Sequence, residues 1–425
     1  MNKIFNRFRQ LTSSGGYTYE LFDYLEHTGH NEYIRIPFHP TEKTNLKFRY
    51  SVPTITEECE IFGCRNSNRT TSFYWYQNTT SGGSIFSRTG NAPQNFGNTI
   101  LYDWYTVEGA STQWVRKRPG TTTTDQYRNW EGTAFTVLYD LFIFAINHAD
   151  IPASSPINQV AGVKMAAMDI LEDQIILMHL HPAKRSDGRT GYLDTLSGEF
   201  HMSVNEYDFN VGNFEDEYVF YDYLESTQNG SSGYLGLQAI DTKIPASSNV
   251  HIKVKAQLTQ ANRFYLFGAR DSSTSNQLVC RLVSLSKPGI TTFDYGTSSQ
   301  DAYMVGSVDI NEIYTIELFD DYNRRIERTD SSGNIISIPI TGSDFTGTSN
   351  ITLFGMNSNN GYDTGFRDQG RVGDTQIWVG NVKMRDYRSA VRKYDSKTGM
   401  FDSVDNILYQ DRGGREFLYG NWITN

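Results

Sequence analysis

The sequence predicts an all-β protein that consists of two tandem β-sandwiches preceded by a short N-terminal segment. Three observations lead to this prediction. The chain of 425 residues repeats itself once, its apolar residues alternate with polar ones over short runs, and 14% of its residues are aromatic. Alternation with a period of two is typical of half-buried strands, and aromatic side chains favour the pleated surface of a sheet.

The repeat is collinear, because the matched segments come in the same order in both halves. The offset between partners stays between 199 and 210 residues. The matches are residues 23–26 with 222–225, 33–36 with 234–237, 62–65 with 267–270, 144–147 with 354–357, Asp194, Gly198 and Phe200 with Asp395, Gly399 and Phe401, and 209–213 with 417–421. We therefore expect an anchoring segment at residues 1–19, a first domain at 20–212 and a second domain at 213–425.

Strands are expected within each copy wherever apolar residues occupy every second position. Residues 46–52 of the first copy and residues 249–256 and 313–319 of the second copy show this alternation. Clusters of Gly, Asn, Asp and Ser interrupt the runs, as at residues 330–334. Many short strands and no long helical stripe favour two antiparallel sandwiches.

The N-terminal segment lies outside the repeat and mixes basic with apolar side chains. Apolar residues up to Leu11 have the spacing of a short amphipathic helix, and residues 13–16 resemble a flexible joint. A disordered terminus is the simpler alternative. The residues that could anchor the chain in a larger assembly are Lys3, Ile4, Phe5, Arg7, Phe8 and Arg9.

The order of these motifs resembles the laminin-G-like, concanavalin A-like jelly-roll domains found in virion proteins and fibres of tailed bacteriophages and in surface proteins of gut bacteria. The resemblance extends from Tyr19 to Asn421. It implies two jelly-roll sandwiches and a structural, non-enzymatic role, such as a head or tail fibre or a capsid decoration protein. Some laminin-G-like domains hold calcium, so Asp-rich turns could do so here, although no defined loop supports it. We predict no other cofactor and no metal site.

An aromatic insertion distinguishes the first copy from the second. Indole faces can stack on sugar rings or anchor protein interfaces, and simple packing within a loop is the alternative. The candidates for glycan binding or an interface are Trp104, Trp114, Tyr127 and Trp130.

Catalytic and metal-binding patterns are weak. Glu20, Asp23 and Glu26 are the nearest approach to a glycosidase pair, but the spacing places the first two on opposite faces of a strand. His179 and His181 share a face, yet no third ligand is evident, so we expect solvent-facing histidines.

Three functions remain. A structural virion component is the main expectation, a bacterial carbohydrate-binding lectin or adhesin is the alternative, and a glycoside hydrolase is the third. The net charge of −10 argues against nucleic acid as a partner. No apolar run long enough for a membrane helix or a signal peptide is apparent, so we expect synthesis in a host cytoplasm and a place in the virion. The expected partners are other virion proteins at the N-terminus, further copies in a dimer or trimer, and host or mucus glycans.

Overall fold

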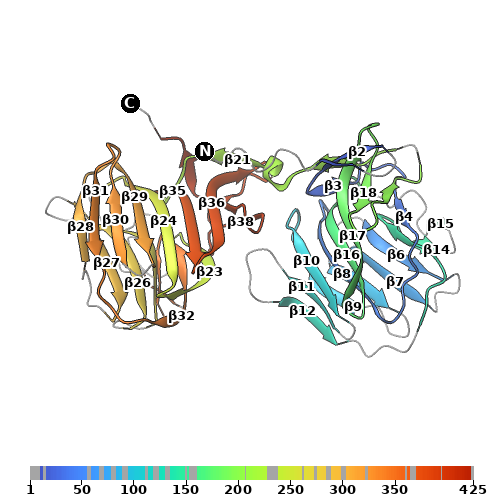
Figure 1. The fold of residues 1–425 in the computed structure, drawn as a ribbon, viewed down its shortest axis with the longest axis horizontal. Helices are drawn as coiled ribbons and strands as arrows, with labels where there is room; N and C mark the ends of the chain where they lie inside the picture. The colour runs from blue at the N-terminus through green and yellow to red at the C-terminus, as the bar shows by residue number, and fades with distance from the viewer. Residues whose placement is uncertain are drawn as a thin grey trace. The chain divides into compact units, whose positions relative to one another are not determined.

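The computed structural model describes most of the chain. The described residues are 10–12, 16–54, 59–66, 71–77, 83–88, 94–110, 113–117, 124–129, 135–148, 151–152, 160–205, 207–226, 238–260, 263–271, 275–283, 289–297, 303–320, 324–358, 361–363, 370–393 and 395–422. Contacts within the chain divide it into unit 1, Met1–Phe214, and unit 2, Glu215–Asn425. Each unit consists of one large and one small β-sheet (Figure 1).

The large sheet of unit 1 has a main path of neighbouring strands and four strands beside it. The main path is β1 (Gln10–Thr12), β2 (Thr18–Leu21), β17 (Ile175–Arg185), β16 (Lys164–Glu172), β5 (Thr44–Ser51), β10 (Tyr105–Ala110), β11 (Gln113–Lys117) and β12 (Thr124–Asn129). The other strands are β3 (Tyr24–Glu26), β18 (Thr190–Asp194), β19 (Phe200–Met202) and β20 (Asn210–Gly212).

The small sheet of unit 1 covers the inner face of the large one. Its strands are β15 (Ile151–Pro152), β14 (Asn147–His148), β6 (Cys59–Arg65), β7 (Ser72–Gln77), β8 (Gly83–Arg88) and β9 (Gln94–Asn98), with β13 (Leu141–Ile143) and β4 (Ile34–Ile36) beside β6. The turn η2 (Phe214–Glu217) follows the last strand of the unit.

The large sheet of unit 2 repeats the order of the six strands from β12 to β17 along the path of unit 1 and then continues differently. Its main path is β31 (Ile335–Pro339), β30 (Arg325–Thr329), β29 (Ile313–Phe319), β24 (Val250–Leu258), β35 (Gly370–Val379), β36 (Val382–Arg392), β37 (Thr398–Asp402) and β38 (Ile407–Tyr409). Beside it lie β21 (Tyr218–Tyr221), β22 (Tyr223–Glu225) and β39 (Leu418–Gly420). The strands β31, β30, β29, β24, β35 and β36 are visible side by side in Figure 1.

The small sheet of unit 2 completes the second sandwich. Its strands are β23 (Ile240–Ser247), β32 (Thr346–Leu353), β25 (Arg263–Arg270), β26 (Gln277–Val283), β27 (Gly289–Gly296) and β28 (Tyr303–Val308), with β33 (Met356–Ser358) and β34 (Gly361–Asp363). The described residues form no α-helix. The predicted fold class, all-β with two tandem β-sandwiches, is confirmed. No helix among the described residues has the length and apolar character needed to cross a membrane.

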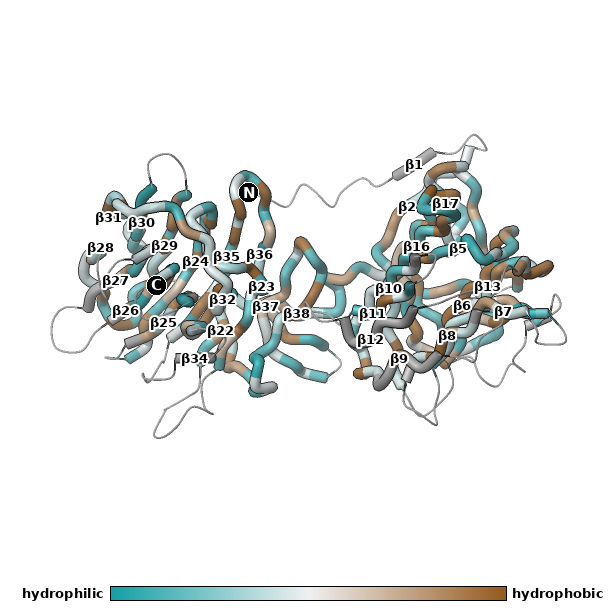
Figure 2. Tube along the Cα trace, turned by 90° about the horizontal axis from the view of Figure 1, so that it is seen from below, coloured by the Kyte–Doolittle hydropathy of each residue, from teal (hydrophilic) through white to brown (hydrophobic). Residues whose placement is uncertain are grey.

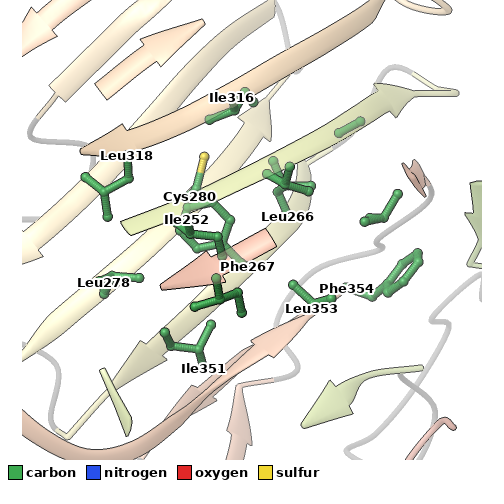
Figure 3. Packing of buried hydrophobic residues seen from close by; sticks show 14 of the residues in the cluster. Ile252, Leu266, Phe267, Leu278, Cys280, Ile316, Leu318, Ile351, Leu353 and Phe354 are labelled. Carbon is green, nitrogen blue, oxygen red and sulfur yellow. The ribbon is translucent and has the colours of Figure 1, made fainter. Parts of the chain in front are cut away.

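The core of each unit lies between its two sheets. In unit 2, Ile252 and Ile316 of the large sheet meet Phe267, Cys280 and Leu353 of the small sheet, and all five side chains are fully buried (Figure 3). Hydrophilic and hydrophobic residues alternate along the strands (Figure 2), because successive side chains point to opposite faces. This alternation is what the sequence predicted.

The closing strand of unit 1 is fixed beside its opening strand. Strand β20 pairs antiparallel with β3. The amide of Asp23 donates to the carbonyl of Gly212 over 3.0 Å, and the carboxylate of Asp23 accepts the amide of Phe214 over 3.0 Å. Gly212 has no room for a side chain, since a Cβ there would lie 2.5 Å from the Tyr24 hydroxyl. We call this arrangement the closing clasp.

Unit 2 has the same closing clasp. The amide of Asp222 donates to the carbonyl of Gly420 over 3.0 Å, and its carboxylate accepts the amide of Trp422 over 2.9 Å. A Cβ at Gly420 would lie 2.6 Å from the Tyr223 hydroxyl. The Asp-Tyr-Leu-Glu and Phe-x-x-Gly-Asn motifs of the repeat therefore encode closure of the sandwich.

The Phe-x-x-Asn motif encodes a change of strand partner. Phe144 and Phe354 both have a left-handed backbone, with φ of 62° and 63°. This conformation is costly for a residue with a side chain. It turns the chain so that Asn147 pairs in parallel with β6 and Asn357 in parallel with β25.

One match of the repeat is wrong. The sequence paired Asp194 with Asp395, whereas the sheet register makes Asp194 equivalent to Asp402. Asp194 accepts the amide of His179 over 3.0 Å, and Asp402 accepts the amide of Asp386 over 2.8 Å. The true match is residues 190–194 with 398–402, because each segment forms the strand next to the long hairpin.

The prediction of a short helix that includes Leu11 is also wrong at the C-terminal end of that segment. Residues 10–12 form the strand β1, which pairs antiparallel with β2. An extended segment with a partner strand satisfies its backbone groups through that strand, as a short isolated helix does not.

The duplicated glycines of β6 and β25 offer a matched test of packing. A Cβ at Gly63 would lie 2.2 Å from Cβ and 2.9 Å from Cα of Tyr74, so the backbone of β7 would have to move. A Cβ at Gly268 would meet only Met356, at 3.1 Å. We expect Gly63→Ala to lower the free energy of unfolding by about 3 kcal/mol, and Gly268→Ala by about 1 kcal/mol. Urea denaturation followed by tryptophan fluorescence measures both, and equal losses would contradict the packing described here.

Candidate functional site

Trp104 was a candidate for glycan binding or an interface, with simple packing as the alternative, and the structure shows the packing. Its side chain is only 4% exposed. The indole packs against Tyr24 and Phe214, with ring centroids 5.4 and 4.8 Å away, and the Arg49 guanidinium lies over it. Trp104 is therefore part of the packing around the closing clasp of unit 1.

Trp114 was a candidate for the same two roles, and it too is packed inside the fold. The side chain is fully buried between the sheets and stacks on Phe86 at 4.1 Å. In β11 the inward positions hold Trp114 and Arg116, while Val115 between them is half-exposed. Arg116 is buried as well and donates to the carbonyl of Phe96 over 2.8 Å. The aromatic insertion thus contributes to the core.

The remaining sequence candidates are not tested by the geometry. Tyr127 lies on β12 opposite Val115 of β11, and nothing is described of its side chain. Trp130 and the anchoring candidates Lys3, Ile4, Phe5, Arg7, Phe8 and Arg9 lie outside the described residues. Their roles stay predictions.

Several histidines and carboxylates of unit 1 that the sequence analysis considered have structural contacts. His179 Nδ1 forms a short contact with the carboxylate of Asp169, and Asp23 belongs to the closing clasp. His201 is buried, which lowers its pKa although Glu199 acts in the opposite direction. The described residues contain no group of three or more side chains arranged to hold a metal ion.

The outer face of the large sheet of unit 2 carries a feature that the sequence analysis missed. Outward positions on five adjacent strands line up across the sheet, because the strand register places them side by side. We call this line the aromatic row, and it consists of Lys383, Trp378, His251, Phe319 and Arg325.

Each member of the aromatic row contacts the next one across the sheet. The imidazole of His251 stacks on the indole of Trp378 at 4.4 Å and lies 5.1 Å from the ring of Phe319. Lys383 Nζ is 5.3 Å from the indole, and the Arg325 guanidinium is 3.8 Å from the Phe319 ring. The three rings are half-buried, so the row presents apolar edges to solvent between a cation at each end.

Polar groups accompany the aromatic row on the same face. Glu317 accepts hydrogen bonds from His251 Nε2 over 3.0 Å and from Lys253 Nζ over 2.9 Å. The cations at the ends also have acidic partners, since Arg325 pairs with Glu327 at 2.8 Å and Lys383 with Asp386 at 3.1 Å. Charges on this face therefore balance locally.

Unit 1 provides a natural comparison, because its large sheet has the same order and register. The positions equivalent to those of the aromatic row hold Ile176, Leu171, Asn45, Ala110 and Gln113. The neighbouring ion pair is retained, with Lys47 Nζ 3.8 Å from Glu108 Oε1. The aromatic row is thus an addition to unit 2 on a scaffold that both units share.

A sequence signal for the aromatic row does exist. Ile377 is fully buried, so its neighbours Gln376 and Trp378 must face outward. A tryptophan at an outward-facing position of a strand does not pack into the core, so it indicates a surface feature. We missed it because aromatic residues in a regular strand resemble ordinary core residues.

Comparison with known proteins identifies no family for this chain. No known family model and no curated protein matches the chain. Among solved structures, domains LG4-5 of the mouse laminin alpha1 chain are 12% identical, with a TM-score of 0.29, and the match covers 83% of this chain and 88% of that one. The LG1-3 region of the laminin alpha2 chain is 8% identical, with a TM-score of 0.28 and coverages of 86% and 63%. The binding domain of botulinum neurotoxin serotype D is 10% identical, with a TM-score of 0.22 and coverages of 98% and 88%.

Glu317 gives the candidate site a measurable pH signature. Burial alone would raise the pKa of Glu317, but hydrogen bonds from His251 and Lys253 outweigh it and hold the pKa below its ordinary value of 4.5. A lowered pKa in the folded state stabilises the protein above that ordinary value, and the contribution is lost as the pH falls through the lowered value.

We therefore expect Glu317→Gln to lower the free energy of unfolding by about 1.5 kcal/mol at pH 7. The difference from the wild type should shrink as the pH falls below 4.5. Urea denaturation at a series of pH values measures it. Glu108→Gln is the matched control, because Glu108 is 38% exposed and its loss should be below about 1 kcal/mol. A pH-independent loss at Glu317 would show that the ion pairs do not stabilise the face.

Proposed function

We propose that this protein is a non-enzymatic carbohydrate-binding protein that recognises glycans through the aromatic row of unit 2. The observation that carries the proposal is the half-exposed line of Trp378, His251 and Phe319, which the shared scaffold of unit 1 lacks. The fold needs no such row, so its presence in one unit alone supports a role in binding.

The chemistry of the row favours a neutral, polyhydroxylated ligand. Apolar ring edges contact the C–H groups of sugars, and the flanking carboxylates, amines and guanidinium exchange hydrogen bonds with hydroxyl groups. The cations Lys253, Lys383 and Arg325 are each paired with a carboxylate. An acidic ligand would have to displace one of these carboxylates, whereas a neutral glycan would not.

The non-enzymatic part of the proposal is supported by the use of Asp23. This carboxylate belongs to the nearest approach to a glycosidase pair in the sequence, and it accepts the amide of Phe214 in the closing clasp. A carboxylate committed to holding the fold is a poor nucleophile or general acid.

We propose a virion of a tailed phage as the setting, where the chain would be a fibre or decoration protein of the head or tail. The resemblance of the motif order to such proteins supports this setting, as does the basic and apolar segment that contains Lys3 and Phe5. That segment would dock onto other virion proteins, and two or three copies would associate. Host or mucus glycans would be the ligands. A bacterial adhesin is the alternative, and mass spectrometry of purified phage particles distinguishes the two.

Trp378→Ala tests the binding surface directly. The substitution removes the indole of the aromatic row, so we expect glycan affinity to fall about tenfold, which corresponds to about 1.4 kcal/mol. Binding is measured on a glycan array and then by calorimetry with the strongest neutral glycan. Circular dichroism checks that the β-structure is retained.

Leu171→Ala, at the equivalent position of unit 1, is the matched control and should leave glycan binding unchanged. Equal losses for both variants, or unaltered binding by Trp378→Ala, would contradict the assignment. Release of reducing sugar from the bound glycan would overturn the non-enzymatic role.

A further inference from the structure

Unit 1 contains an open cavity of about 520 Å³ at the edge of its large sheet, where β2 meets the end of β17. The cavity lies within the range of small-molecule sites, which runs from about 300 to 1,000 Å³. Its lining residues are Thr18, Glu20, Lys184, Arg185, Ser186, Asp187 and Gly188.

Two residues that line the cavity, Arg185 and Asp187, are paired with each other. Arg185 donates to both carboxylate oxygens of Asp187, with Nε 3.0 Å from Oδ1 and Nη2 2.6 Å from Oδ2. Its guanidinium lies 4.5 Å from the ring of Tyr17 and 5.3 Å from the ring of Phe200. The charges of Arg185 and Asp187 thereby neutralise each other within the protein.

The polar wall of the cavity holds two charged side chains that have no partner among the described residues. Glu20 and Lys184 are paired across β2 and β17, and both side chains are exposed. Among the described contacts, neither side chain forms a hydrogen bond or an ion pair. The hydroxyl groups of Thr18 and Ser186 add two further polar groups to the same cavity.

Unit 2 shows which part of this arrangement belongs to the scaffold. The equivalent of the Arg185–Asp187 pair is retained, since Arg392 donates to both oxygens of Asp395 at 3.0 and 2.6 Å. The positions equivalent to Glu20 and Lys184 hold Val219 and Val391, which pair in the same register. The polar wall is therefore specific to unit 1 and is not needed to close a sandwich.

We infer that the cavity of unit 1 is a second carbohydrate site, which holds a single neutral hexose. A carboxylate accepts two neighbouring hydroxyl groups, an ammonium group donates to ring or hydroxyl oxygens, and the two hydroxyl side chains can do both. One positive and one negative group leave no net charge to attract an ion. The ligand class is that of the proposed function, but the site is independent of the aromatic row.

The test is saturation-transfer NMR of the full chain with D-glucose, D-galactose and D-mannose as probes and glycine as a zwitterionic control. The protein should bind at least one hexose and should not bind glycine. Glu20→Val combined with Lys184→Val copies unit 2 and preserves the Arg185–Asp187 pair, so the fold should be retained. This double variant should weaken hexose binding at least about tenfold.

Trp378→Ala keeps the two proposals separate, because it should leave hexose binding in the cavity unchanged. No hexose signal from the folded wild type would overturn the site, as would binding of glycine in place of the hexoses. Equal hexose binding by the double variant would place the sugar elsewhere. Loss of the hexose signal in Trp378→Ala would assign it to the aromatic row.

Discussion

Pairing of the first core strand with the last one is the constraint on which each sandwich depends. In both units a single aspartate, Asp23 or Asp222, joins these strands through its amide and its carboxylate. The glycine of the closing strand allows a tyrosine of the opening strand to lie directly against the backbone. These hydrogen bonds join residues nearly two hundred positions apart in the sequence, so the two ends of each unit are held together.

A scaffold closed in this way can vary elsewhere. The two large sheets share strand order, register and the Lys47–Glu108 type of ion pair, yet their outer faces and edges differ. Unit 2 adds aromatic side chains across the face, and unit 1 adds the polar pair of Glu20 and Lys184 at the edge. Duplication followed by divergence at exposed positions explains the pattern. The segments that match between the units hold the fold, and the units differ in the side chains that they expose.

The sequence predicted the fold because closure and alternation leave strong local patterns. The motifs at residues 23–26 and 209–213 correspond to the closing clasp, and the motif at 144–147 corresponds to a left-handed turn. Exposure was harder to predict. Trp104 and Trp114 lie among Gly and Thr, which resembles a loop, yet each indole fills the interior. The phase of β11 would have indicated this for Trp114, as the phase of β35 would have indicated Trp378. The cavity has no sequence signal, because Glu20 and Lys184 meet only through strand pairing.

Hydrogen–deuterium exchange of the full chain with Asp222→Ala tests most directly whether each closing clasp holds its own sandwich. The substitution removes the carboxylate that accepts the Trp422 amide. Amides of β22, β39 and the adjacent β35 should exchange faster than in the wild type, while those of β3 and β20 in unit 1 keep their protection. Unchanged exchange in β22 and β39 would contradict the role of the clasp, and equal loss of protection in both units would contradict the independence of the two closures.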